Sequence, residues 1–190
     1  MGFLIFEFFA TATQTSLTTL KDNSSLLIKS KLPRELFALS RVLTAFVNFL
    51  LGCIPFAAVL AWYRAAVTIY YFMIPVVLLL LLIFTTGMSY LVSIWFVFQR
   101  DARNIYSNFI FILRFFVAMF YSVDWVADGV KWVIQHNPLY AYIYVMRQCV
   151  VYGRMPEGMY ITQMFAWAIG MFGFGILVFK KYENEVVERL

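Results

Sequence analysis

The chain has 190 residues, a length typical of one domain, and 63% of them are hydrophobic, which excludes an ordinary water-soluble protein of this size. Only 13% are charged, and the net charge is +5 at pH 7. In a membrane protein basic residues set orientation, so this excess does not indicate nucleic-acid binding. We therefore expect an all-α integral membrane protein in which residues 1–190 form one transmembrane domain.

Five apolar segments follow one another along the chain. A helix of about 20 residues is enough to cross the hydrocarbon core of a bilayer, and the third segment has 29 residues without a charge. The second half of the first segment, "TATQTSLTTL", is rich in Thr and Ser, which hydrogen-bond across helix interfaces or line wet cavities. The predicted spans are Phe3–Leu20, Leu36–Trp62, Tyr70–Phe98, Ile105–Tyr121 and Ile161–Phe179.

A long aromatic stretch, Ser122–Tyr160, separates the fourth and fifth segments. It contains Pro138 and Pro156, and "LYAYIYVMRQCVVY" reads as a short helix with Arg147 inside it. The stretch is too interrupted to span a bilayer, so we expect re-entrant or interfacial half-helices before the last span.

The distribution of Lys and Arg predicts the orientation of the segments. If the five segments alternate in direction, ten of the 15 basic residues lie on one side and four on the other, with Arg114 inside a span. Basic residues favour the cytoplasmic side. The N-terminus of this sequence would then begin outside, and we expect that an amino-terminal part with a further span is missing. The ten predicted cytoplasmic residues are Lys21, Lys29, Lys31, Arg34, Arg41, Arg100, Arg103, Lys180, Lys181 and Arg189, and the four outer ones are Arg64, Lys131, Arg147 and Arg154.

Four motifs occur in order along nearly the whole chain: "NSSLLIKSKLPREL" from Asn23, "QRDARNI", "HNPLYAYIYVMRQ" and the closing "GILVFKKYE". Together they resemble bacterial polysaccharide-export permeases, the membrane subunits of ATP-binding-cassette exporters for O-antigen, capsule and teichoic acid chains. Members of that family run longer at the amino terminus, with an amphipathic helix and a first span. The family often has a Ser-Pro pair after its fifth span, and here "MFYSVDW" has no proline.

The resemblance implies a multi-pass subunit of the bacterial cytoplasmic (inner) membrane. Its implied partners are a second copy of the permease, a separate ATPase subunit, membrane lipid and a lipid-linked polysaccharide that moves outward. ATP and Mg²⁺ would be bound by the partner ATPase, with no cofactor in this chain. The chain has no GxSxG, HExxH or phosphate-binding Gly-rich motif and no cluster of metal-ligating residues, so we expect a transport subunit and no enzyme.

The first motif is the predicted contact with the ATPase. A permease without its own ATPase must receive force through a rigid protrusion, and a short helix with apolar residues suits a groove on a partner. The basic residues would pair with acidic rims and the proline would stop the helix. An ordinary basic loop on anionic lipid is the alternative. The predicted coupling residues are Asn23, Leu26, Leu27, Ile28, Lys29, Pro33, Arg34 and Glu35, together with Arg100 and Asp101 at the next turn on the same side. For Arg100 and Asp101, simple anchoring of the end of the third span at the membrane interface is an equal alternative.

A second set of residues is predicted to line the substrate path or its outer gate. The free energy of inserting a charged side chain such as Arg114 into a membrane is unfavourable, so we expect it to face a partner or a water-filled cavity. Sugar rings stack on aromatic faces, which favours tyrosines and tryptophans near the outer side, although belts of Tyr and Trp at the membrane interface have the same composition. The candidates are Arg114, Tyr121, Trp125, Asn137, Pro138, Tyr140, Tyr144 and Arg147.

Three other functions fit parts of the sequence. An exporter of drugs, lipids or small peptides would have the same architecture. A membrane-bound enzyme acting on lipid-linked sugars would need acidic or His residues in one cavity, but Glu7, Asp101, Asp124, Asp128 and His136 are scattered. A passive scaffold would leave the interrupted stretch Ser122–Tyr160 without a purpose.

Overall fold

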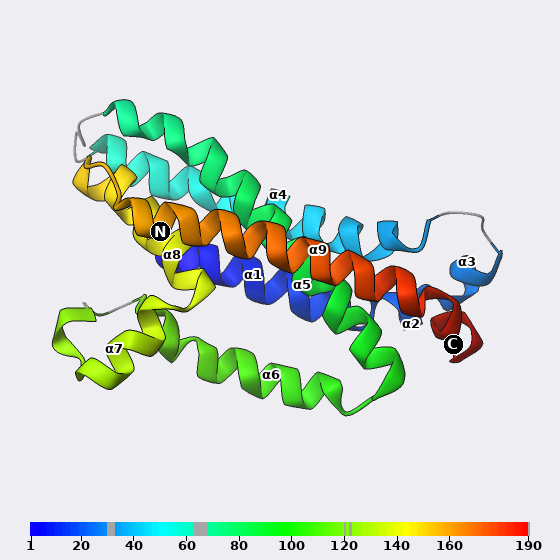
Figure 1. Cartoon of the computed structure of the whole chain (residues 1–190). Coiled ribbons are helices and arrows are strands. Elements are labelled where there is room, and N and C mark those ends of the chain that lie inside the picture. The colour runs from blue at the N-terminus through cyan, green and yellow to red at the C-terminus, as the bar shows by residue number, and fades with distance from the viewer. Residues whose placement is uncertain (30–32, 63–67, 120, 122, 190) are drawn as a thin grey trace.

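The computed structural model describes residues 1–29, 33–62, 68–119, 121 and 123–189, with the backbone alone for residues 28, 29, 124, 187 and 188. Every regular element within these residues is a helix, which confirms the all-α expectation. Figure 1 shows an elongated bundle whose long helices run between two ends. The elements are α1 (Gly2–Leu17), α2 (Thr19–Asp22), α3 (Ser24–Lys29), α4 (Glu35–Trp62), η1 (Ile69–Met73), α5 (Ile74–Phe98), α6 (Ala102–Leu113), η2 (Phe115–Val117), η3 (Val123–Trp125), α7 (Asp128–Gln135), α8 (Pro138–Arg147), η4 (Gln148–Tyr152) and α9 (Gly158–Arg189).

Helix α1 lies at the centre of the bundle. It contacts α4, α5, α6 and α8, and Phe8 and Phe9 are almost fully buried. Phe9 stacks on Phe84 of α5 with ring centroids 5.7 Å apart. The hydroxyl of Thr13 donates to the carbonyl of Phe9 one turn back, as Thr and Ser do inside apolar helices that offer no other acceptor. One face of the Thr-rich half, with Thr13, Ser16 and Thr19, is therefore packed inside the protein, whereas Thr11 and Thr15 are exposed.

The most extensive helix contact joins α5 and α9, and two glycines allow it. A Cβ on Gly87 would meet the backbone carbonyl of Met171, and a Cβ on Gly175 would meet the backbone of Gly87. Apolar side chains gain little by leaving lipid, so helices in a membrane associate mainly through close van der Waals contact between small residues. The two helices touch backbone to backbone at this crossing.

Three described helices are long and apolar enough to cross a membrane, namely Glu35–Trp62, Ile69–Phe98 and Gly158–Val186. They correspond to the second, third and fifth predicted spans. The first predicted span is divided between α1 and α2, and the 16 residues of α1 measure about 24 Å against a hydrocarbon core of about 30 Å. The sequence predicts about five spans, and two of them are present as shorter helices.

The fourth predicted span, Ile105–Tyr121, is not one helix. Helix α6 ends at Leu113, and after the short turn η2 the buried Ala118 adopts a left-handed conformation with φ 47°. That conformation costs an ordinary residue about 1 kcal/mol and stops a helix. Arg147 of α8 donates to the carbonyl of Ala118 at 3.3 Å and stabilises the turn. The chain is thus turned by a contact from a distant helix.

The interrupted stretch before the last span forms short helices, as expected. Helix α7 has eight residues and α8 has ten. Asn137 caps α8, because its side-chain oxygen accepts from the backbone N–H of Leu139 at 3.0 Å and Pro138 occupies the first turn. Tyr142 at the centre of α8 is fully buried, and its hydroxyl donates to the carbonyl of Met164 in α9.

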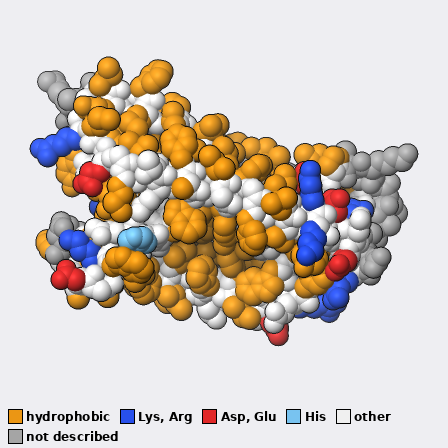
Figure 2. Space-filling model, viewed as in Figure 1, with side chains coloured by type: hydrophobic (Ala, Val, Ile, Leu, Met, Phe, Trp, Pro, Cys, Tyr) orange, Lys and Arg blue, Asp and Glu red, His pale blue; other side chains and the backbone are white. Residues whose placement is uncertain are grey.

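The described basic residues of the predicted cytoplasmic group and those of the predicted outer group lie at different ends of the bundle. The polar end formed by α2, α3 and the C-terminal part of α9 places Lys180 near Glu35 and Arg189 over the ring of Phe98. Lys131, Arg147 and Arg154 line a cavity formed by α7, α8 and the following turn. Figure 2 shows charged side chains at both ends and a largely apolar surface between them. Arg64 and Lys31 lie outside the described residues.

Candidate functional site

A polar cavity of about 380 Å³ lies at the end of the bundle formed by α7, α8 and the beginning of α9. It brings together three predicted residues, Tyr140, Tyr144 and Arg147. The other residues of its lining include two more of the predicted outer cations, Lys131 and Arg154, two amides and one carboxylate. The full lining is Val123, Lys131, Gln135, Tyr140, Tyr144, Arg147, Gln148, Tyr152, Arg154, Glu157 and Tyr160.

Three tyrosine rings form one wall of this cavity. The ring centroids of Tyr144 and Tyr160 are 4.1 Å apart, and Tyr140 lies 6.0 Å from Tyr144 and 5.8 Å from Tyr160. Tyr140 and Tyr144 are one turn apart on α8, so both rings face the same way. The rings offer flat apolar faces at the edge of a polar cavity, an arrangement suited to the C–H face of a sugar.

Polar groups in the cavity are held in defined positions. The hydroxyl of Tyr144 donates to Oε1 of Glu157 at 3.0 Å. Burial, then the hydrogen bond to Glu157 and its charge, raise the pKa of Tyr144 to about 12, so this hydroxyl remains a donor at neutral pH. Lys131, Arg147 and Arg154 outnumber the single carboxylate of Glu157, which gives the described part of the lining a positive balance.

The remaining predicted gate residues have other positions. Trp125 is 86% exposed and does not line the cavity. The hydroxyl of Tyr121 donates to the carbonyl of Phe115 at 2.6 Å and closes the turn after α6. Asn137 and Pro138 begin α8, and the amide of Asn137 also donates to the carbonyl of Phe116 at 3.2 Å. Asn137 therefore links the start of α8 to η2.

Arg114 faces a charged partner. Its Nη2 lies 2.7 Å from Oε1 of Glu7, and its guanidinium sits 5.5 Å from the centroid of the Phe6 ring. Both side chains are partly exposed, at 41% and 36%. The pair joins α6 to α1, which fulfils the expectation that a charge at this position has a partner.

Removing one charge of this pair is expected to destabilise the protein more than removing both. Arg114→Met leaves the Glu7 carboxylate without its partner, and Glu7→Gln leaves Arg114 without its own. Because both side chains are partly exposed, each cost should lie below the about 2.5–3.5 kcal/mol of a charge at the centre of a spanning helix. The double variant avoids the unpaired charge and should recover most of the loss. Thermal unfolding of the three variants in detergent measures this. Additive losses in the double variant would show that the pair is not coupled.

The predicted coupling helix α3 lies at the end of the bundle opposite the polar cavity, and the role predicted for one of its residues, Leu27, is wrong. The sequence predicts that Leu27 enters a groove on the ATPase. It is 5% exposed, within a cluster that includes Leu20, Phe179 and Val186 of the same chain, so it anchors α3 to its own bundle. Leu26 is 54% exposed and remains open to a partner. The side chains of Ile28 and Lys29 lie outside the described residues.

The expected ion pairs of this loop with an ATPase are also partly replaced by contacts within the chain. Arg34 donates to the carbonyl of Glu183 at 2.6 Å and to the side chain of Asn184 at 3.2 Å. Glu35 lies 3.9 Å from Lys180. The amide of Asn23 donates to the carbonyl of Thr19 and closes the turn between α2 and α3. Arg34 and Glu35 therefore join the beginning of α4 to the C-terminal part of α9, and Asn23 fixes the turn before α3.

Arg100, Asp101 and Pro33 are exposed at the same end as α3. Arg100 lines a small cavity with Lys21 and Arg189, so the turn between α5 and α6 lies beside α2 and the C-terminal end of α9. The structure thus brings both predicted coupling segments to one end of the bundle.

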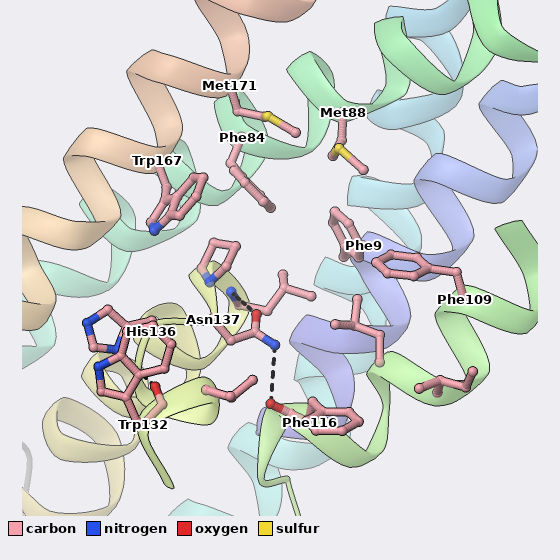
Figure 3. A pocket seen from close by; sticks show the side chains of 15 residues that line it. Phe9, Phe84, Met88, Phe109, Phe116, Trp132, His136, Asn137, Trp167 and Met171 are labelled. Carbon is pink, nitrogen blue, oxygen red and sulfur yellow. Dashed lines mark hydrogen bonds between the residues drawn. The ribbon is translucent and has the colours of Figure 1, made fainter. Parts of the chain in front are cut away.

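A second, apolar cavity of about 540 Å³ lies between α6, α7 and the bundle (Figure 3). Phe9, Met88, Phe109 and Trp167 converge on it from four helices, and His136 and Trp132 stand at one edge. An adjoining cavity of about 460 Å³ shares Met88, Phe109 and Met171 with it. Together they form one groove along α6.

Sequence reasoning missed several of these residues. Tyr160 and Glu157 complete the polar cavity, and Glu7 is the partner of Arg114. The spacing of Tyr140 and Tyr144 was a visible signal for one wall. Tyr160, Glu157 and Glu7 meet their partners only through the tertiary fold, and no local pattern marks them.

Comparison with known proteins fits this architecture. The family model described as "ABC-2 type transporter" matches residues 1–151. Two curated relatives, both described as "O-antigen export system permease protein RfbA" from Klebsiella pneumoniae, are each 25% identical to this chain over 190 residues. The alignment covers the whole chain and 73% of each relative. Because the family model covers most of the sequence, this multi-pass membrane protein belongs to the ABC-2 type transporter family.

Proposed function

We propose that this chain is the permease subunit of an exporter that moves a lipid-linked polysaccharide outward across the bacterial cytoplasmic membrane. The O-antigen export permeases to which it is similar along its whole length support the substrate class. The observation that carries the proposal is the polar cavity with its wall of Tyr140, Tyr144 and Tyr160. Rings beside amides and charged groups suit the mixed apolar and hydroxylated surface of a sugar.

Two copies of the permease and two copies of a separate ATPase would make up the exporter. The exposed Leu26 on α3 and the neighbouring turn with Arg100 and Asp101 offer a surface for the ATPase. Helix α9 touches α3 near its C-terminus and lines the polar cavity with Tyr160 near its start. A movement of α3 driven by the ATPase would therefore be transmitted to the outer end of the bundle through α9.

Replacement of Tyr144 by Ala should reduce export. The change removes a ring of the cavity wall and the hydrogen bond to Glu157, and loss of about 1 kcal/mol of stacking corresponds to about a fivefold effect. Trp125→Ala is the matched control, because this ring is exposed outside the cavity. Surface polysaccharide is measured in cells that lack their own permease and carry the full-length wild type or a variant.

The controls separate two kinds of failure. If wild-type permease with its ATPase restores no surface glycan, the proposed substrate class is wrong. If wild type restores the glycan and Tyr144→Ala does so equally well, the cavity is not on the export path. A Tyr144→Phe variant keeps the ring and should fall between wild type and Ala.

A further inference from the structure

We propose that the exposed polar side of α1 binds the hydroxylated chain of the substrate, so that the export path runs along this helix. The inference rests on the proposed function and adds an inner binding surface to the polar cavity at the outer end. We name this surface the α1 polar face; it consists of Glu7, Thr11 and Gln14 in α1 and the cap residue Thr18.

The α1 polar face is one narrow stripe. With 3.6 residues in each helical turn, its four side chains fall within about 60° of one another around the axis. Thr11 and Gln14 are exposed and Glu7 is partly exposed, whereas Thr13 and Ser16, on other sides of α1, are buried. The side chains of Thr11 and Gln14 have no hydrogen-bond partner among the residues that the structure describes. A row of unused hydrogen-bonding groups therefore follows the central helix of the bundle.

Helices α4 and α6 lie on opposite sides of α1 and flank this face (Figure 1). Phe8 and Phe6 are about 100° to either side of Glu7. The Phe8 ring packs on Phe46 of α4 with centroids 5.6 Å apart, and the Phe6 ring centroid lies 5.5 Å from the guanidinium of Arg114 at the end of α6. The face thus points into the sector between these two helices. A cavity of about 130 Å³ lies on the α4 side of this sector, lined by Leu4, Glu7, Phe8, Thr11, Ala45, Asn48 and Phe49.

The rim of the sector that α4 forms is polar. Arg41, Thr44 and Asn48 recur at helical spacing along one side of α4, and all three are exposed. Nε of Arg41 donates to the hydroxyl of Thr19 in α2 at 3.4 Å, and Asn48 lines the cavity with Thr11. This side of α4 therefore borders the α1 polar face.

The rim that α6 forms is polar as well. Arg103, Ser107 and Arg114 fall within about 40° of one another around α6, and the ion pair of Arg114 with Glu7 at 2.7 Å places this side of α6 beside α1. Ile105, which lines the apolar groove, lies on the opposite side of α6. One side of α6 thus suits hydrocarbon and the other suits water.

A hydrated, hydroxylated chain is the occupant that fits this sector. The amides of Gln14 and Asn48 each donate and accept hydrogen bonds, as sugar hydroxyls do, and hydrocarbon would leave them unpaired. The charges of Glu7 and Arg114 neutralise each other, so the sector suits an uncharged chain. The side chains of Glu7 and Gln14 are long, whereas membrane helices that pack closely meet through small residues. Helix α1 also contacts α8, whose tyrosines line the outer polar cavity, so the two binding surfaces belong to neighbouring elements.

Single cysteines test whether this sector holds water and substrate. In the full-length permease with Cys53 and Cys149 changed to Ser, Asn48→Cys places a thiol in the sector. Val47→Cys is the matched control, because Val47 is at the same depth, 55% exposed and outside the cavity lining. A membrane-impermeant methanethiosulfonate reacts with the thiolate, which forms in water, so it should label Asn48→Cys about tenfold faster than Val47→Cys or more. In membranes from cells that make the glycan, this labelling should slow several-fold relative to cells that do not, because the chain occupies the sector.

An export assay in the same cells completes the test. Gln14→Leu should reduce surface glycan about fivefold, since it removes one hydrogen bond to the chain, and Val47→Leu should leave export unchanged. If wild type restores the glycan but Asn48→Cys is labelled no faster than Val47→Cys, lipid or another helix covers the sector and this inference alone is overturned. Labelling that the glycan does not slow would overturn it too, since the sector would then hold water alone. Failure of the wild type to restore the glycan would overturn the proposed function and this inference with it.

Discussion

Gly87→Ala is expected to destabilise the protein by about 2 kcal/mol or more, and Gly87→Leu to prevent its folding. A Cβ at this position would lie on the backbone of Met171 and Phe172, so no rotamer change relieves the clash. The two helices would have to separate along their most extensive contact. Thermal unfolding in detergent measures the loss. In a background with the partly exposed Cys53 changed to Ser, a thiol-reactive dye that reaches the buried Cys149 only on unfolding provides the signal.

Gly173 is the matched control for this substitution. It lies on α9 two residues from the crossing glycine Gly175, and nothing would lie within 4 Å of its Cβ. Gly173→Ala should therefore leave stability unchanged or raise it slightly, since Ala favours a helix more than Gly does. Equal unfolding temperatures for Gly87→Ala and wild type would mean that α5 and α9 are not in backbone contact.

Leu26→Asp is expected to separate the permease from its ATPase while membrane insertion and folding persist. On the proposed function Leu26 enters an apolar groove of the ATPase, and a buried Leu contributes about 1.5–3 kcal/mol, or about tenfold to a hundredfold in affinity. The carboxylate adds the cost of an unpaired buried charge. The side chain is 54% exposed in the permease, so its own bundle loses little. Co-purification of the ATPase with the full-length permease, together with an export assay, measures the effect.

Ser25→Asp adds the same charge one residue away without removing an apolar side chain and serves as the control. Leu27→Asp should act differently, because Leu27 is buried in the bundle and its loss unfolds this end. Normal co-purification and normal export with Leu26→Asp would show that α3 does not dock on the ATPase and belongs to an ordinary basic loop. Normal co-purification with lost export would place the docking contact elsewhere, with Arg100 and Asp101 as the next candidates.

The sequence by itself determined the class of the protein. Apolar runs as long as Tyr70–Phe98 have no stable place except a bilayer, and the backbone must then be helical because no water is present to satisfy its N–H and C=O groups. The distribution of basic residues predicts Lys180 and Lys131 on opposite sides, and they lie at opposite ends of the bundle. The short helix predicted from Leu139 onward is present as α8, and its start at Pro138 is fixed locally by the Asn137 cap.

Only the tertiary structure decided which residues meet. The apolar run Ile105–Tyr121 predicted one span, but α6 ends at Leu113, and Arg147 donates to the carbonyl of Ala118 in the turn that follows. Leu26 and Leu27 are alike in sequence, and contact with Phe179 and its neighbours makes one of them internal. Glu7 and Arg114 pair across 107 positions. Such choices depend on atoms brought together from distant segments, so local patterns do not contain them.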